Sequence, residues 1–113
     1  MELAFASKEL RVLCLRADHA TAVLGAEQAA QLRHRLADMR AAKCALDVIA
    51  GMPEIATDFD GTECRRYRLG SDMHLLVRAN HRTLPKLPSG AIDWARVTRI
   101  KITHVGVVNA DHH

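Results

Sequence analysis

The chain has 113 residues, with 16 Lys or Arg against 13 Asp or Glu, and its formal net charge is +3. An apolar fraction of 49% and a charged fraction of 26% are typical of a globular domain and exclude an intrinsically disordered chain. The length predicts a single domain over residues 1–113 and excludes a multidomain enzyme.

The chain shows no sign of a membrane segment or a metal site. No apolar run approaches the roughly 20 residues of a membrane-spanning helix, and the N-terminus lacks the basic segment and apolar core of a signal peptide. We therefore expect a cytoplasmic protein with no membrane partner. The cysteines are too far apart for a zinc knuckle and the histidines are mostly scattered, so we expect no metal and no cofactor.

The first half of the chain predicts a strand followed by helices. Residues 3–6 form a short apolar run, and Ser7 is a suitable N-cap for a helix whose apolar stripe extends to Gly25. A second helix begins at Ala26, and we expect the two helices to pack as a hairpin. Residues 45–50 predict a short third helix. One face of the second helix is apolar and is formed by Ala29, Leu32, Leu36 and Met39.

Residues 51–62 are acidic and rich in turn formers, so they predict a loop between the two halves of the chain. Within them, residues 58–62 (Asp-Phe-Asp-Gly-Thr) match the aspartyl nucleophile signature of haloacid-dehalogenase-like phosphatases. That signature requires a buried strand before it, but Pro53 and Glu54 stand there. We therefore favour an acidic turn over a phosphatase nucleophile.

The second half predicts strands. Residues 63–69 and 73–79 form a hairpin joined by Gly70-Ser71-Asp72, residues 80–90 form an exposed loop, and residues 100–105 form one more strand. The order strand, helices, strands predicts an α+β domain with helices on one face of a mainly antiparallel sheet.

Positive charge is concentrated in this second half. Residues 1–62 carry seven Lys or Arg against nine Asp or Glu, whereas residues 63–113 carry nine against four. A basic half of this kind fits a polyanion such as RNA or an acidic protein partner, and it equally fits an ordinary solvated face.

The hairpin distributes its basic residues over two faces. Alternation along the first strand places Arg66 and Arg68 on one face and Arg65 with Tyr67 on the other. A three-residue turn would place Arg68 opposite His74, whereas a two-residue turn would pair His74 with Tyr67. In the second strand, His74 shares its face with the basic residue four positions later, Arg78.

A face that bears arginine, histidine and an aromatic ring suits RNA cleavage without a metal. Arginine stabilises the charge that develops on the phosphate, histidine moves protons near neutral pH, and an aromatic ring stacks on a base. The alternative is a solvent-facing sheet whose arginines serve solubility or an acidic partner.

Four segments match the pattern of a known family: Phe5-Ala6-Ser7-Lys8-Glu9-Leu10, the helix at residues 32–42, the hairpin at residues 68–77, and residues 92–102 with their Asp-Trp-x-x-Val-Thr motif. Through them the chain resembles the RelE/ParE superfamily of bacterial toxins, and HigB-like members most closely. The resemblance implies a RelE-like fold, in which an N-terminal strand and a helical hairpin pack on a twisted, mainly antiparallel sheet. It also implies a toxin of a type II toxin–antitoxin system that cleaves ribosome-bound mRNA, and a cognate antitoxin, expected to be a helix-turn-helix protein, that blocks the basic face.

The resemblance assigns the catalytic role to Arg68 and His74. Arg68 falls on a basic position of the family hairpin, whereas His74 stands where most members have a second arginine, and Met73 replaces the usual aromatic residue. Many members end the last strand in an Asp-Tyr-His group; here residues 107–109 are Val-Val-Asn, and Asp-His-His follows at residues 111–113. The residues expected to bind RNA are Arg65, Arg66, Tyr67 and Arg78.

Two functions follow from these observations. The first is a metal-independent, ribosome-dependent mRNA endoribonuclease, or mRNA interferase. The alternative is the same fold without catalysis, either a ParE-like inhibitor of DNA gyrase or a degenerate protein-binding module. The basic hairpin and His74 favour the nuclease, and the missing terminal Tyr favours the alternative.

Overall fold

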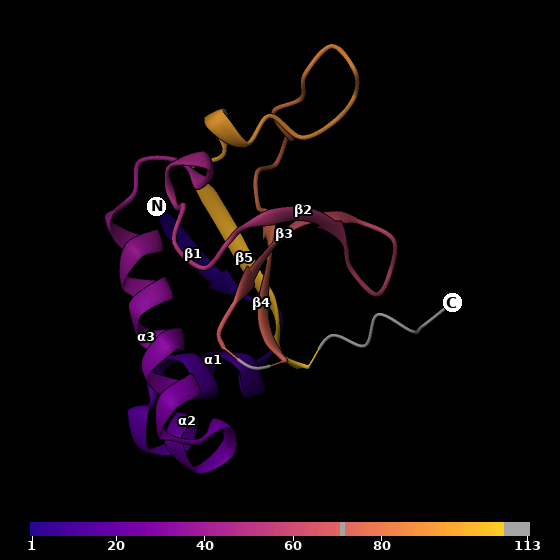
Figure 1. Ribbon diagram of the computed structural model, residues 1–113. Coiled ribbons are helices and arrows are strands. Elements are labelled where there is room, and N and C mark those ends of the chain that lie inside the picture. The colour runs from indigo at the N-terminus through magenta and orange to yellow at the C-terminus, as the bar shows by residue number, and fades with distance from the viewer. Residues whose placement is uncertain (71, 108–113) are drawn as a thin grey trace.

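The computed structural model describes residues 1–70 and 72–107, which form an α+β fold with helices on one side of a mixed sheet (Figure 1). The helices are α1 (Lys8–Leu15), α2 (Ala17–Leu24) and α3 (Ala26–Ala41). The strands are β1 (Glu2–Phe5), β2 (Glu54–Thr57), β3 (Glu63–Arg68), β4 (Met73–Ala79) and β5 (Arg99–Val107). Two short 3₁₀ turns are η1 (Ala45–Asp47) and η2 (Trp94–Arg96).

The five strands form one sheet in the order β1-β5-β4-β3-β2. β1 runs parallel to β5, and every other neighbouring pair is antiparallel. The predicted mainly antiparallel sheet is therefore confirmed. β1 and β2 are the two edge strands, so β3, β4 and β5 are paired on both sides.

The helices differ from the prediction at two points. The short helix predicted for residues 45–50 is only the 3₁₀ turn η1, which covers Ala45–Asp47. The predicted helix from Ser7 to Gly25 is divided into α1 and α2, because Arg16 adopts extended backbone angles and donates to the Asp18 carboxylate at 2.9 Å. Ser7 caps α1 as predicted, and its Oγ accepts from the backbone of Leu10. Gly25 ends α2 at φ +87°, as predicted. In the described part of the chain, no helix has both the length and the apolar character needed to cross a bilayer.

The hydrophobic core lies between the helices and one face of the sheet. The predicted apolar stripe of α3 is buried there, and it belongs to the same cluster as buried side chains of β3, β4 and β5. The sheet contributes Tyr67, Leu75, Val77, Ile100 and Ile102. Because every second residue of a strand points to the opposite side, the intervening residues form a second face that the helices leave open.

The loop predicted for residues 51–62 contains the edge strand β2, which is a correction. β2 has four residues and pairs with β3 alone. A segment of four residues after Pro53 is too short for any alternation of apolar and polar residues to distinguish a strand from a loop. The favoured turn at residues 58–62 is confirmed: the Asp58 amide donates to the Thr62 carbonyl at 2.9 Å, and the Asp58 carboxylate accepts from the backbone of Asp60 and Thr62. The turn projects on the side of the sheet away from α3 (Figure 1).

The β3–β4 hairpin has the register of the three-residue turn, which places Arg68 opposite His74. Gly51 supports the end of β3, because its carbonyl accepts from the Arg68 amide at 2.7 Å. Gly51 has φ +89°, and a Cβ there would lie 3.2 Å from Arg35 Cδ and 3.3 Å from the Arg68 carbonyl oxygen. This position therefore requires glycine for both its backbone conformation and its close packing.

Candidate functional site

The two faces of β3 carry basic residues with different environments. Arg66 and Arg68 lie on the open face, with Arg68 exposed, whereas Arg65 and Tyr67 point toward the helices and are buried. The distribution predicted from alternation is therefore confirmed. The consequence is that one strand supplies both a structural arginine and the arginines of a candidate site.

Arg65 is a structural residue. Its side chain donates from Nε to the Tyr67 hydroxyl at 3.0 Å and from Nη2 to the Val48 carbonyl at 3.2 Å, and its guanidinium lies over the Trp94 ring at 6.0 Å. Arg65 is 6% exposed and Tyr67 only 1%. The RNA-binding roles predicted for Arg65 and Tyr67 are corrected on this ground, because a polynucleotide on the open face cannot reach either side chain.

Arg68 and His74 form the centre of the candidate site. They are directly opposite in the hairpin and point to the same open face, at a typical Cβ separation of about 5 Å for such pairs. Arg66 lies one pair further along the same face. Gly106 of β5 is the other cross-strand neighbour of His74 and places no side chain beside the ring.

The hydrogen bonding of His74 defines which ring nitrogen can take up a proton. Nδ1 lies 3.0 Å from the Asp72 carbonyl oxygen, which can only accept, so Nδ1 carries the hydrogen and Nε2 keeps its lone pair. Partial burial lowers the pKa of His74 below its ordinary value, and the charges of Arg66 and Arg68 lower it further. The imidazole is therefore neutral near pH 7 and suited to accept a proton.

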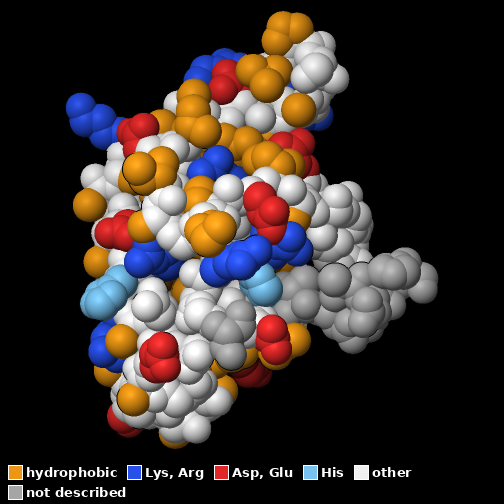
Figure 2. Space-filling view, in the orientation of Figure 1, with side chains coloured by type: hydrophobic (Ala, Val, Ile, Leu, Met, Phe, Trp, Pro, Cys, Tyr) orange, Lys and Arg blue, Asp and Glu red, His pale blue; other side chains and the backbone are white. Residues whose placement is uncertain are grey.

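Figure 2 shows Lys and Arg side chains in a band across the middle of the view, with a His side chain adjoining it. Not all of this charge is available to a ligand. Arg66 forms an ion pair with Glu54 of the edge strand β2, and this pair lowers the pKa of the Glu54 carboxyl. Arg68, by contrast, has no carboxylate partner among residues 1–70 and 72–107.

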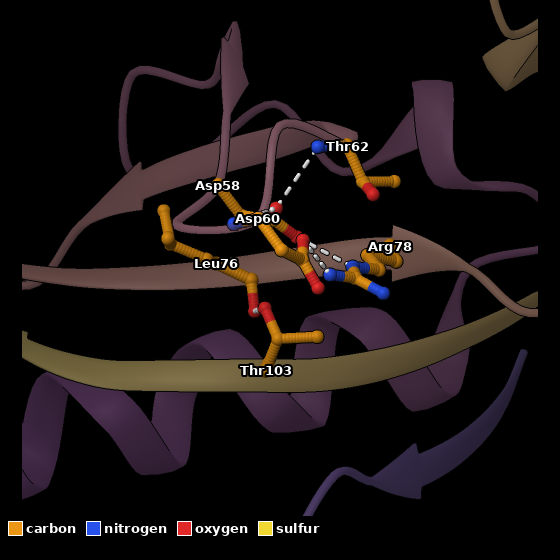
Figure 3. Close-up of polar contacts among 6 residues, drawn as sticks. All are labelled: Asp58, Asp60, Thr62, Leu76, Arg78 and Thr103. Atoms are coloured by element: carbon orange, nitrogen blue, oxygen red, sulfur yellow. Dashed lines mark hydrogen bonds and ion pairs between the residues drawn. The ribbon is translucent and has the colours of Figure 1, made fainter.

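Arg78, at the other end of β4, is held by the turn at residues 58–62 (Figure 3). Its Nε donates to the Asp58 carboxylate at 2.5 Å, and its Nη2 donates to Asp60. The Asp58 side chain is 3% exposed and that of Asp60 is 68% exposed. Hydrogen bonding with Asp58, and then with Arg78, lowers the pKa of Asp60 to about 2, so this carboxylate is ionised at neutral pH. The predicted RNA-binding position Arg78 is thus already occupied by carboxylates.

Sequence reasoning missed this contact because its partners are 18 and 20 residues apart and belong to halves of opposite net charge. Counting the net charge of each half of the chain separately assumes that the two halves form separate surfaces. The sheet instead pairs arginines of the second half with acids of the first, in the ion pairs Arg66–Glu54, Arg78–Asp58, Arg78–Asp60 and Arg99–Glu2. On the open face of the described sheet, Arg68 and Lys101 are therefore the cations without a carboxylate partner.

Two cavities adjoin the sheet on opposite faces. A cavity of about 360 Å³ lies on the open face beside the 58–62 turn, and Arg78, Lys101 and Thr103 form part of its wall. A larger groove of about 770 Å³ lies beside β2 and is lined in part by Ile55, Leu87 and Trp94. The larger groove is therefore separate from the Arg68–His74 pair.

The described residues contain no group of three side chains that could hold a metal ion. The Asp-His-His sequence at residues 111–113 lies outside the described residues. Comparison with known proteins gives no assignment: no family model, curated protein or solved structure matches this chain.

Proposed function

We propose that this protein is the toxin of a type II toxin–antitoxin pair, with a RelE-like fold, and that it cleaves ribosome-bound mRNA at Arg68 and His74. One observation supports this proposal above the others. An exposed arginine without a carboxylate partner among the described residues stands directly opposite a histidine whose Nε2 is a proton acceptor. These two groups can supply a general base for the 2′-hydroxyl and a cationic donor to the phosphate, which both favour transfer of an RNA phosphodiester to its own 2′-hydroxyl.

The cleavage step assigns one role to each residue. His74 Nε2 accepts the proton of the 2′-hydroxyl, and the 2′-oxygen attacks the adjacent phosphorus. The bond from phosphorus to the 5′-oxygen breaks, and this leaving oxygen takes up a proton from the imidazolium or from water. The products are a 2′,3′-cyclic phosphate and a 5′-hydroxyl. Arg68 donates to the phosphate oxygens, whose negative charge increases in the transition state.

The proposed partners follow from the same face. A cognate antitoxin, which we propose to be a helix-turn-helix protein, would cover the Arg68–His74 pair with an acidic segment. Because much of that attraction involves exposed charges, its affinity should fall as salt rises. An affinity that is equal at low and high salt would contradict this mode of neutralisation.

The test of the proposed function compares two double variants in cells. The first, Arg68→Ala with His74→Ala, removes the candidate site; the second, Arg33→Ala with His34→Ala, removes the same residue types from an exposed face of α3. We expect growth arrest and new mRNA 5′ ends from the wild type and from the α3 variant, and neither from the site variant. Transcripts that stay intact during growth arrest would exclude the nuclease.

A second candidate function is protein binding without catalysis, as a gyrase inhibitor or another protein-binding module. The groove beside β2 favours it, because the groove has exposed apolar walls that include Leu46, Ile55 and Leu87. The same experiment separates the two candidates, since a protein-binding toxin arrests growth without new mRNA ends.

A further inference from the structure

The contact between Arg78 and the 58–62 turn divides into a fixed part and a replaceable part. Asp58 is buried, and besides pairing with Arg78 Nε its carboxylate accepts the amides of Asp60 and Thr62 (Figure 3). Asp60 is exposed, and Arg78 is its partner in the ion pair. The Asp60 side chain can therefore rotate into solvent while Asp58 keeps the turn in place.

Lys101 adds a second cation to the same corner of the sheet. It is the direct cross-strand partner of Arg78, and both side chains line the 360 Å³ cavity with Thr103. No ion pair to Lys101 occurs within residues 1–70 and 72–107. An anion that replaces Asp60 would thus meet two neighbouring cations, whereas Asp60 pairs with only one of them.

We propose that Arg78 and Lys101 form a second phosphate subsite for the RNA strand, and that the Asp60 carboxylate fills this subsite in the free protein. The inference rests on the proposed function, because it takes RNA as the ligand of the open face. Arg78 and His74 lie on the same face of β4, four residues apart, which corresponds to about 13 Å. One extended strand of RNA can therefore contact both positions.

The exchange is favourable because the two competing contacts differ in strength. An exposed ion pair such as Arg78–Asp60 contributes little, since water and salt screen it. A phosphate presents several oxygens and can accept from Arg78 and Lys101 together. Asp60 thus reduces the binding of other anions at Arg78, and an RNA strand that is also held at Arg68 displaces the Asp60 side chain.

The test measures binding separately from cleavage. The probe is a single-stranded RNA oligonucleotide with 2′-O-methyl groups, which lacks the nucleophile, and the readout is its fluorescence anisotropy over a range of salt concentrations. Asp60→Asn is compared with Asp18→Asn, which removes an equally exposed carboxylate from an arginine pair on the helical side. We expect Asp60→Asn to tighten binding about fivefold and to steepen the salt dependence by about one phosphate contact. Asp18→Asn should change the affinity less than twofold, as expected for a distant surface charge.

The subsite requires Lys101, so Lys101→Gln in the Asp60→Asn background should remove most of the gain. Lys101 pairs with no carboxylate among the described residues, and its removal therefore tests the subsite without breaking the Asp58–Arg78 contact. Three results would overturn the subsite: equal affinities for the Asp60 and Asp18 variants, a gain that survives Lys101→Gln, or no RNA binding by the wild type and Asp60→Asn alike.

These outcomes are independent of the nuclease. Tighter binding by Asp60→Asn with no His74-dependent cleavage would support the subsite and contradict the proposed catalysis. His74-dependent cleavage with no effect of Asp60→Asn on binding would support the proposed catalysis and contradict the subsite.

Discussion

The two faces of the sheet use the same residue type for different purposes. Arg65 and Arg66 are neighbours in β3, yet Arg65 is enclosed between Tyr67 and Trp94 while Arg66 lies at the open face beside Glu54. On the helical face, the guanidinium donates to neutral oxygens that would otherwise be buried without partners. On the open face, the Arg66 guanidinium pairs with the exposed Glu54 carboxylate. The comparison shows that the partner type and the degree of burial distinguish the buried structural arginine from the arginines of the candidate site.

The largest difference between the faces should be in stability. Arg65→Ala leaves the Tyr67 hydroxyl and the Val48 carbonyl without their donor and opens a cavity, so we expect it to lower the free energy of unfolding by about 3 kcal/mol. Arg66→Ala removes an exposed pair and should cost less than about 1 kcal/mol. Urea denaturation measures both values. Equal losses for the two variants would contradict the assignment of Arg65 as structural.

The open face should show the opposite behaviour, with a loss of activity and no loss of stability. We expect His74→Ala to reduce the rate of RNA cleavage about a hundredfold or more, as for removal of a general base. Because His74 is only partly buried, its replacement should change the unfolding free energy of the protein by less than about 0.5 kcal/mol. Single-turnover cleavage by the wild type and the variant measures the effect. A variant that retains the wild-type rate would show that His74 is not the base.

Two glycines with similar φ angles sharpen the comparison of the faces. Gly51 lies where β3 meets Arg35 of α3, whereas Gly61 belongs to the turn on the open side and has no atom near the position of a Cβ. Both alanine variants introduce strain at positive φ, but only Gly51→Ala also introduces close contacts. We therefore expect Gly51→Ala to lower the unfolding free energy by about 1 kcal/mol more than Gly61→Ala. Thermal or urea unfolding of the two variants tests this. Equal losses of unfolding free energy would show that the neighbours of Gly51 move apart without cost to accept the added methyl group.

The smallest expected effects are changes in the pKa of His74. Arg66 disfavours the charged imidazole and Glu54 favours it, so Arg66→Gln should raise this pKa and Glu54→Gln should lower it. NMR titration of the ring protons measures both changes. Since the proposed base is the neutral ring, cleavage by the wild type should decline as the pH falls through a value below 6.5, and it should do so at higher pH in Arg66→Gln. Shifts of the same sign in both variants would contradict the electrostatic cause.

The parts of the structure that local sequence determines were predictable. Alternation in residues 63–79 gave the faces of the hairpin, and its turn limited the register to two possibilities, of which the structure has Arg68 opposite His74. The apolar stripe of α3 and the glycine stop at Gly25 were also evident. Each of these features depends on residues that are close in the chain.

The features that sequence did not reveal depend on distant neighbours or on short segments. The four residues of β2 form a strand because they pair with the edge of β3. Their own sequence shows no alternation that would indicate a strand. The burial of Arg65 follows from the positions of Val48 and Trp94, which only the fold brings together. Likewise, the net charge of the second half said nothing of Arg78, which is compensated from the other half of the chain.

The β-bulge between β4 and β5 has a consequence for how this sheet tolerates insertion and deletion. Leu76 pairs with His104 and Val77 with Ile102, so Thr103 is an extra residue that returns a hydrogen bond to the Leu76 carbonyl. Removing Thr103 would leave His104 and its successors in phase, because the pairs on either side would simply become consecutive. The strand would lose its local bend, and with it the wall that Thr103 contributes to the cavity. A one-residue deletion here is thus a way to flatten one corner of the molecule without turning any other side chain over.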